Sequence, residues 1–338
     1  MDAFVNRIWY QNHWLKWLLW PLSWLFALIS GARRLLFRFG LKPIEHLPVP
    51  VLLVGNITVG GSGKTPMVIY LIELLRQHGY RPGVISRGYG SQQQHPRLVT
   101  AASTASDVGD EPAMIVSRTQ VPMAVGQDRI ATAKLLLAEH DVDIIISDDG
   151  LQHYRLARDI ELLVVDAKRQ LGNGMLLPAG PLREGRWRLN TVDFVVENGA
   201  QQDAAQRFAM QLKAGELQPL TTTAAIPPQS VKAVAGIGNP QRFFDTLTQL
   251  GYDVAETQAF ADHHPYVAAD FVRSDTQLPL VMTEKDAIKC RNLRIENSWY
   301  LPVDACLSDQ FSAQLLAKVA SVVAKKRIAK NEGRTNGV

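Results

Sequence analysis

The feature that most restricts the fold of this chain is a glycine-rich loop between an apolar run and an amphipathic segment. The run "VPVLLVGN" (49–56) suits a buried strand, and "TPMVIYLIELLRQHG" (65–79) has Pro66 in the first turn of a helix and Gly79 at its end. A helix that follows such a loop presents the backbone N–H groups of its N-terminus to an anion. The sequence therefore predicts a phosphate-binding loop between a strand and a helix.

The loop departs from the commonest phosphate-loop pattern, G-x-x-x-x-G-K-[ST], at its first position, where Thr58 replaces glycine. The pair Gly60-Gly61 still permits a sharp turn, Lys64 can reach the outer phosphates, and the Thr65 hydroxyl can ligate Mg²⁺. We therefore predict a nucleotide site made by Thr58, Val59, Gly60, Gly61, Ser62, Gly63, Lys64 and Thr65.

Short apolar runs and helical patterns alternate after this loop. Runs suited to buried strands occur at 83–86, 122–126, 143–147, 160–167 and 193–199. Helical patterns such as "DRIATAKLLLAEH" separate several of them. This alternation predicts an α/β fold with a P-loop NTPase-like, mostly parallel sheet that carries helices on both faces.

Two adjacent acids, Asp148 and Asp149, follow the apolar run at 144–146. A nucleotide site needs a metal-holding acid after a second buried strand, so one of these carboxylates is expected to hold Mg²⁺ together with Thr65. Neighbouring side chains on a strand point to opposite faces, so the two acids are expected to have different roles. A strand-ending Asp-Asp-Gly turn without a function is the alternative interpretation.

The N-terminal segment has the composition of a membrane interface, because five of the seven tryptophans lie in the first twenty-four residues. The uncharged run from Trp17 to Ile29 would be about 20 Å long as a helix, short of the roughly 30 Å hydrocarbon core. Pro21 and Ser23 are expected to interrupt it. These features predict an anchor that lies in the plane of the membrane surface, with headgroup contacts from Arg33, Arg34 and Arg38. The alternatives are a buried or dimer-forming helix and a cleaved signal peptide.

Net charge and cysteine content narrow the possible partners. The net charge of +4 and the pI near 9.0 suit an anionic partner, but no basic stripe with interleaved aromatic residues indicates nucleic acid. The two cysteines, Cys290 and Cys306, lack the spacing of a zinc site and the density of a disulfide scaffold, which favours a reducing, intracellular setting. No obligate protein partner is inferred.

Eight short strings in order along most of the chain resemble the tetraacyldisaccharide 4'-kinases, which phosphorylate the lipid A disaccharide precursor at the inner-membrane surface of Gram-negative bacteria. The strings are "VGNITVGGSGKTP", "SRGYG", "DVGDEP", "SDDGLQH", "LLPAGPLREG", "AGIGNPQRFF", "FADHHPY" and "TEKDAIK". The resemblance implies transfer of the γ-phosphate of ATP, with Mg²⁺, to the 4'-hydroxyl of a tetraacyldisaccharide 1-phosphate. The product would be lipid IVA, made at the cytoplasmic face of the inner membrane.

The resemblance also implies roles for residues outside the glycine loop. Asp110 would be the base, His263 would pair with it across an interdomain cleft, and His264 is the open alternative for that pairing. Asp110 and Glu111 are expected in a loop bounded by Gly109 and Pro112. The predicted catalytic residues are Asp110, His263, Lys64 and Asp149, and the predicted metal ligands are Thr65, Asp148, Asp149 and Glu111.

Polar residues near the carboxyl ends of the predicted strands are candidate substrate contacts, since ligands bind at this edge of open parallel sheets. An arginine there can hold a phosphate bidentately. The predicted substrate-binding residues are Arg87, Tyr89, Gln152, His153 and Arg183. The pair Thr283 and Asp286 in "TEKD" predicts a helix capping box instead.

The chain is expected to contain several units. They are a membrane-associating helical segment (1–40), a P-loop nucleotide-binding domain (41–200), a β-hairpin linker that acts as a hinge (201–228), a smaller α/β domain that closes over the site (229–325) and a frayed basic tail (326–338). A membrane-tethered ATPase or GTPase of regulatory or transport-coupling type is the competing function. A second domain that carries an acid/base candidate favours the kinase.

Overall fold

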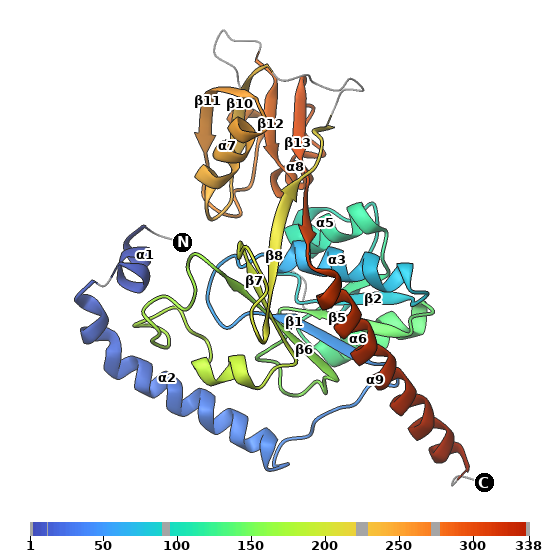
Figure 1. The fold of residues 1–338 in the computed structure, drawn as a ribbon. Coiled ribbons are helices and arrows are strands. Elements are labelled where there is room, and N and C mark those ends of the chain that lie inside the picture. Colours follow the sequence, from blue (N-terminus) through green and yellow to red (C-terminus); the bar gives the residue numbers. More distant parts are fainter. Residues whose placement is uncertain (1–2, 12, 90–94, 221–228, 272–277, 336–338) are drawn as a thin grey trace.

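Two β-sheets organise the chain, a large one at the centre and a smaller one above it (Figure 1). The computed structural model describes residues 3–11, 13–89, 95–220, 229–271 and 278–335. The predicted α/β class is confirmed, because both sheets are mostly parallel and carry helices. The residues that the predictions placed at 221–228 and 336–338 lie outside the described part of the chain.

The large sheet has nine strands in the order β14-β8-β7-β6-β1-β5-β2-β4-β3. Its inner strands are parallel, whereas β14 and β3 pair antiparallel at the two edges. The chain leaves β1 toward β5 and β2 and later crosses to β6 on the other side, which makes a switch point where ligands bind. The strands are β1 (Val51–Gly55), β2 (Pro82–Ser86), β3 (Arg97–Val99), β4 (Met123–Val125), β5 (Ile144–Asp148), β6 (Ile160–Asp166), β7 (Phe194–Asn198), β8 (Arg207–Ala214) and β14 (Val303–Cys306).

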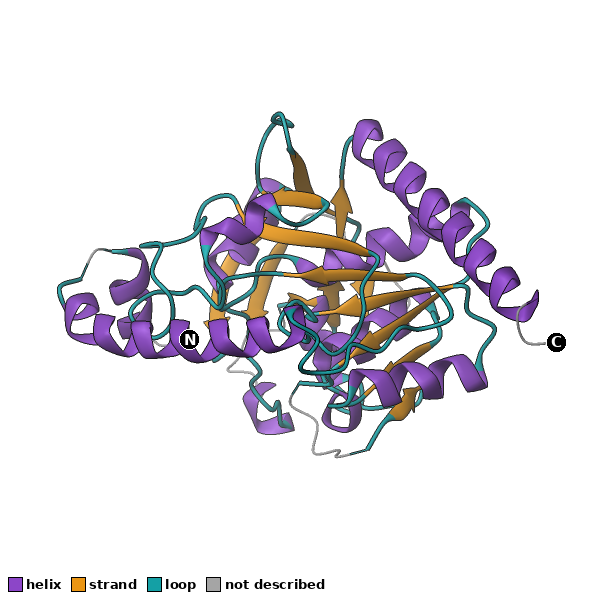
Figure 2. Cartoon of the chain, turned by 90° about the horizontal axis from the view of Figure 1, so that it is seen from below, coloured by secondary structure: helices purple, strands orange, loops and turns teal. Residues whose placement is uncertain are grey.

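Both faces of the large sheet are buried, and successive residues of β1 show why. Leu52 and Val54 pack on one face beneath α3, α5 and α9, whereas Val51 packs on the other face against α6. A strand that is covered on both sides reads as a continuous apolar run, which made this strand predictable. Figure 2 shows strands between helices in a view from below. The helices of this unit are α3 (Lys64–Gln77), α4 (Ala105–Val108), α5 (Asp110–Thr119), α6 (Arg129–Glu139), the 3₁₀ helix η1 (Arg186–Asn190) and α9 (Asp309–Thr335).

The smaller sheet has the order β11-β10-β12-β13-β9, in which only β9 runs antiparallel to its neighbour. Phe243 and Phe244 of α7 pack with Trp299 in its core. The strand, loop and helix from β10 to α7 make this unit an α/β domain, as expected for the region after residue 229. The elements are β9 (Gln218–Pro219), β10 (Ser230–Ala235), α7 (Pro240–Gln249), β11 (Asp253–Ala259), η2 (Ala268–Phe271), β12 (Leu280–Thr283), α8 (Glu284–Cys290) and β13 (Ser298–Leu301).

The expected hairpin in the linker is not formed in the described residues. The two strands of this region, β8 and β9, do not pair with each other. β8 lies between β7 and β14 in the large sheet, and β9 joins β13 in the small one. The connection between the sheets is instead a ribbon of β8 and β14, closed by a hydrogen bond from the Gly215 N–H to the Pro302 carbonyl (2.9 Å). Alternating side chains predict a strand but not its partner, which is why the sequence was misleading here.

The last helix also departs from the expected boundaries. Residues up to 325 were assigned to the smaller domain, yet β14 and α9 return to the large sheet, where Phe311, Leu315 and Val319 are fully buried. The expected frayed tail is likewise wrong in its first part, because α9 continues to Thr335. Lys326 ties this helix to the start of β1 through the carbonyl oxygens of Leu47 and Val49.

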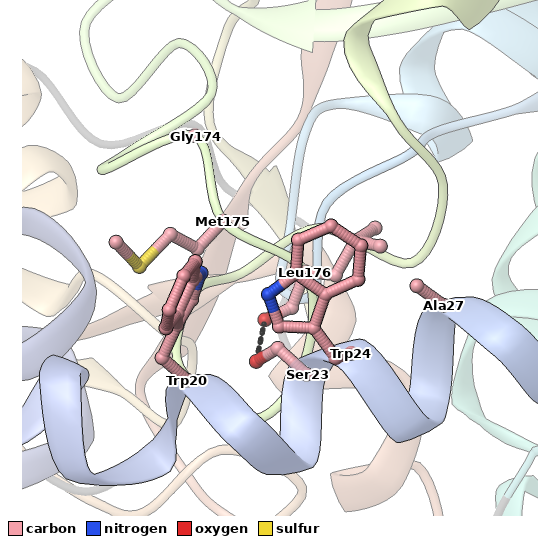
Figure 3. A pocket seen from close by; sticks show the side chains of 7 residues that line it. All are labelled: Trp20, Ser23, Trp24, Ala27, Gly174, Met175 and Leu176. Carbon is pink, nitrogen blue, oxygen red and sulfur yellow. Dashed lines mark hydrogen bonds between the residues drawn. The ribbon is translucent and has the colours of Figure 1, made fainter.

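The N-terminal segment forms α1 (Ala3–Tyr10) and the long helix α2 (Leu15–Arg38). Pro21 lies inside α2 without ending it, so the expected interruption is wrong. By length and composition α2 could cross a membrane. It is fastened along its middle to the loop after β6, however, since the Ser23 hydroxyl donates to the Leu176 carbonyl (2.9 Å) (Figure 3). The same hydroxyl accepts a hydrogen bond from the Ala179 N–H (3.0 Å).

A shallow cavity of about 220 Å³ lies at this contact. Trp20 and Trp24 of α2 stand on either side of Ser23 and face the loop at Met175 (Figure 3). The opposite side of α2 is an exposed apolar face, which we define by Trp17, Leu18, Leu25, Leu28 and Ile29.

The placement of α9 in the core of the large unit leads to a stability prediction. Phe311→Ala should lower the free energy of unfolding by about 3–5 kcal/mol, because it removes a fully buried ring that packs on Phe194 and Phe208. Urea denaturation measures the difference. The matched control is Gln314→Ala on the exposed side of the same helix, which should stay close to the wild type. Equal effects of the two variants would contradict the docking of α9.

Candidate functional site

The glycine loop joins β1 to α3 at the carboxyl edge of the large sheet, at the switch point. Gly60 and Gly63 have φ angles of 107° and 94°, which side chains other than glycine rarely adopt. Two asparagines hold the loop, because Asn56 donates to the Gly60 carbonyl (3.2 Å) and Asn198, at the end of β7, donates to the Ser62 carbonyl (3.0 Å). These two carbonyl oxygens are thereby tied back into the protein, as is the Val59 N–H, which donates to the Pro181 carbonyl (2.9 Å). A glycine-rich turn of this kind at a helix N-terminus can present its other N–H groups to an anion.

Lys64, the first residue of α3, ends beside the second of the paired acids. Its ammonium lies 3.5 Å from Asp149, and the Arg183 guanidinium lies 3.2 Å from the same carboxylate. Burial acts to raise the pKa of Asp149, but Lys64 and Arg183 outweigh it, and the pKa is lowered. Asp149 has a φ of 47°, since β5 ends at the preceding residue and the chain turns there. Asp149 is therefore ionised and held between two cations.

Asp148 lies in a different environment, because it is the last residue of β5 whereas the chain has already turned at Asp149. The carboxyl is almost fully buried and accepts a hydrogen bond from Ser86 (3.2 Å) on Oδ2, while Oδ1 has no hydrogen-bond partner among the described residues. Burial and the carboxylates of Glu111 and Asp149 raise the pKa of Asp148 to about 7. A buried carboxylate oxygen without a partner, close to other acids, suits a cation that balances their charge.

The predicted metal ligands are only partly brought together. The described residues contain no group of three or more His, Cys, Asp or Glu side chains that could form a metal cage. The three-carboxylate set of Asp148, Asp149 and Glu111 is thus not assembled, because Asp149 is turned toward Lys64 and Arg183. Mg²⁺ commonly needs one or two carboxylates and completes its shell with water and phosphate, so Asp148 with Thr65 fits it better.

Asp110 begins α5, rather than lying in a loop as expected. Gly109 before it has a φ of 95°, and a Cβ there would come within 2.7 Å of the Tyr89 carbonyl, so the "SRGYG" and "GDEP" segments touch. A carboxylate at a helix N-terminus is stabilised by the helix dipole. Asp110 is also largely buried, since only 14% of its side chain is exposed.

The smaller domain supplies His263, whose Nδ1 donates to Asp110 Oδ2 over 2.9 Å. Burial acts to raise the pKa of Asp110, but the hydrogen bond from His263 and the ammonium of Lys289 keep it low. His264 is turned away, because it stacks on Phe260 and bonds to Asp270 (3.0 Å). Of the two histidines, His263 is therefore the one that contacts Asp110.

The predicted substrate residues lie around this edge and differ in their exposure and in their contacts with other side chains. Arg87 and Tyr89 are exposed, and the Tyr89 ring lies 5.8 Å from the His263 ring. Gln152 donates to the buried Glu184 (2.8 Å). Burial and, to a smaller extent, the nearby Arg129 lower the pKa of His153 to about 4, so this ring is neutral at pH 7. Arg183 is engaged with Asp149.

Several residues of the site were missed from the sequence. Arg129 is 3% exposed and donates to the Asp148 carbonyl (2.8 Å), and Asn56 and Asn198 hold the glycine loop. Each lies at or just beyond the carboxyl end of a predicted strand, and that position was the available signal. Lys285 and Lys289 lie in the quoted string "TEKDAIK", but only a cap was inferred there. Thr283 does cap α8, while Asp286 bonds to the Gly236 N–H (2.9 Å).

The backbone of the glycine loop leads to a paired prediction. Gly63→Ala should destabilise the protein more than Gly79→Ala, although both residues have a left-handed φ that costs alanine about 1–2 kcal/mol. A Cβ at Gly63 would lie 2.5 Å from the Asn198 amide nitrogen, whereas a Cβ at Gly79 meets nothing within 4 Å. Free energies of unfolding measure the difference. Equal costs would mean that Asn198 does not hold the loop rigidly.

Comparison with known proteins agrees with this geometry. The family model "Tetraacyldisaccharide-1-P 4'-kinase" matches residues 15–320. Tetraacyldisaccharide 4'-kinases of Shewanella sp. (strain ANA-3) and Shewanella halifaxensis are 60% and 59% identical to the chain, over 100% and 96% of its length and 100% of theirs. The crystal structure of LpxK from Aquifex aeolicus in complex with ATP superposes with a TM-score of 0.78 at 29% identity, over 91% of this chain and 99% of that one. The chain belongs to the tetraacyldisaccharide-1-P 4'-kinase family.

Proposed function

We propose that this protein transfers the γ-phosphate of ATP to the 4'-hydroxyl of a tetraacyldisaccharide 1-phosphate, giving lipid IVA. The observation that carries the proposal is the hydrogen bond between Asp110 and His263, because it joins the two domains at the edge that bears the glycine loop. Family membership supports the same activity, and it favours the kinase over a regulatory ATPase or GTPase. A switch protein would not need a base that is completed by a second domain.

Each part of the site has a role in this proposal. The loop from Thr58 to Thr65 binds the phosphates, and Lys64 neutralises their charge. His263 and Lys289 both approach Oδ2 of Asp110, so Oδ1 is the oxygen that would accept the proton of the sugar hydroxyl. As the proton leaves, the hydroxyl oxygen bonds to the γ-phosphorus and the bond to the bridging oxygen breaks, which releases ADP.

Asp148 and Thr65 are the residues we propose for Mg²⁺, with Glu111 nearby as a further acid. The metal would supply charge neutralisation at the β- and γ-phosphates. Asp149 holds Lys64 in place, as their 3.5 Å contact suggests. Arg87, Tyr89, Gln152, His153 and Arg183 are proposed to line the sugar site, Gln152 and His153 through the loop that they order.

The membrane surface is the proposed location, on the cytoplasmic face of the inner membrane. The exposed apolar face of α2 suits the boundary between headgroups and acyl chains. A spanning orientation would carry the loop at 174–179 into hydrocarbon, because Ser23 in the middle of α2 is bonded to it. Irregular backbone is not tolerated in lipid, so an in-plane helix is the better reading.

A phosphate-transfer assay tests the activity and the base together. With radiolabelled ATP, Mg²⁺ and the disaccharide precursor in detergent, the wild type should label the lipid. Asp110→Asn keeps the hydrogen bond to His263 but cannot accept a proton, so kcat should fall by roughly 10²–10⁴-fold while the affinity for ATP is retained. Asp245→Asn, on the exposed side of α7, is the matched control. Label that appears only as free phosphate would rule out the kinase.

The anchor is tested on the exposed face of α2 alone. Replacing Trp17, Leu25 and Leu28 by Gln should move the protein from the membrane to the soluble fraction, since it removes apolar area while keeping Ser23 docked. Ile328→Gln on the exposed side of α9 is the control for a loss of surface hydrophobicity. Unchanged membrane retention of the triple variant would contradict the in-plane anchor.

A further inference from the structure

Asp286, at the start of α8, is a fully buried carboxylate in the smaller domain. Its Oδ2 accepts hydrogen bonds from the Gly236 N–H (2.9 Å) and the Thr283 hydroxyl (2.6 Å), and its Oδ1 accepts from Lys289 (3.0 Å). A Cβ at Gly236 would lie 3.0 Å from Oδ1, so this glycine leaves room for the carboxylate. A buried charge held by this many partners is costly to assemble, and capping one short helix does not require it.

Lys289 carries the charge of this cluster to the interface between the domains. Only 7% of its side chain is exposed, its ammonium lies 5.2 Å from the centre of the Tyr266 ring, and it approaches Asp110 Oδ2 at 3.8 Å. That distance makes an ion pair and is too long for a hydrogen bond. Lys285, one turn earlier, bonds to Asp262 (3.1 Å) and lies 3.4 Å from His263 Nε2. One face of α8 therefore presents two ammonium groups to the Asp110–His263 pair.

The other end of this interface holds the two helices in register. Arg118, in the last turn of α5, bonds to Glu284 at the start of α8 (2.9 Å) and to the Val303 carbonyl (3.0 Å). Asp110 and Lys289 lie at the opposite ends of the same two helices. α5 and α8 lie side by side in Figure 1. Lys289 can reach Asp110 only when these helices are packed, so its contact reports the assembled site.

We infer that Lys289 is a positioning residue for phosphate transfer: held by Asp286, it fixes the Asp110 carboxylate from the second domain so that Oδ1 faces the acceptor hydroxyl. The inference rests on the proposed function for its chemistry and on the geometry of α5 and α8 for its placement. Lys289 acts through Asp110 in this role, since its ammonium contacts Asp110 Oδ2 and Asp286 Oδ1.

Steady-state kinetics of Lys289→Met test this role in the full-length protein in detergent. The kcat should fall by roughly 10-fold to 100-fold, a part of the roughly 10²–10⁴-fold contribution of a positioned base, while the KM for ATP changes little. Lys289→Arg keeps the charge and should retain most of kcat. Lys232→Met, which breaks the ion pair with Glu256 in the same domain, is the matched control and should behave as the wild type. A normal kcat for Lys289→Met would overturn the inference and leave the proposed kinase intact.

The double variant Asp286→Asn/Lys289→Met separates loss of stability from loss of positioning, because it removes both buried charges. Its urea midpoint should be higher than that of Lys289→Met, but its kcat should stay low. Recovery of kcat would assign Lys289 a structural role only.

The placement of Lys289 is tested without activity by a double-mutant cycle of urea midpoints for Asp110→Asn and Lys289→Met. Non-additive shifts support the contact, and additive shifts overturn it even if the enzyme proves inactive toward the disaccharide.

Discussion

The packing of α8 on α5 is the interaction on which the candidate site depends. Neither domain contains the arrangement alone, because Asp110 begins a helix of the large unit while His263, Lys285 and Lys289 come from the small one. The carboxylate at the helix N-terminus attracts the cations, and Asp262 and Asp286 hold the two lysines in place from within the smaller domain. The base is therefore assembled by the packing of one domain on the other in this architecture.

Charge balance explains the rest of the edge. Lys64 and Arg183 flank Asp149, and Arg129 binds the backbone beneath Asp148, so most charges here are compensated within the protein. Asp148 is the exception, with an oxygen that lacks a partner among the described residues and a pKa raised to about 7. A site that binds a magnesium nucleotide needs such a carboxyl oxygen, which has no partner in the described part of the chain and can bind a cation. The glycine loop has the opposite preference, since N–H groups at a helix N-terminus favour a bound anion.

Local patterns predicted the elements well and their partners poorly. The strand, glycine loop and helix at 49–79 are formed as expected, and the inner strands of the large sheet lie at the predicted places. The linker shows the limit, because alternation identified a strand near β8 without telling that β14, some ninety residues later, would pair with it. The predicted placement of α9 in the smaller domain was wrong for the same reason, because its buried residues pack on the distant large sheet. Pro21 does not end α2, a helix that is held by the contacts of Ser23 with a distant loop.

The candidate residues divide in the same way. The identity of the phosphate loop, the paired acids and the family resemblance are properties of short strings, whose chemistry is set by residue type and spacing. Their environments are not local: the same two aspartates become a buried acid whose pKa is raised and an acid paired with two cations whose pKa is lowered, because β5 ends between them. The sequence by itself determined which groups could bind and react. Only the tertiary structure decided which histidine meets Asp110 and that a lysine of the other domain stands behind it, since such contacts depend on distances between segments that lie far apart in the chain.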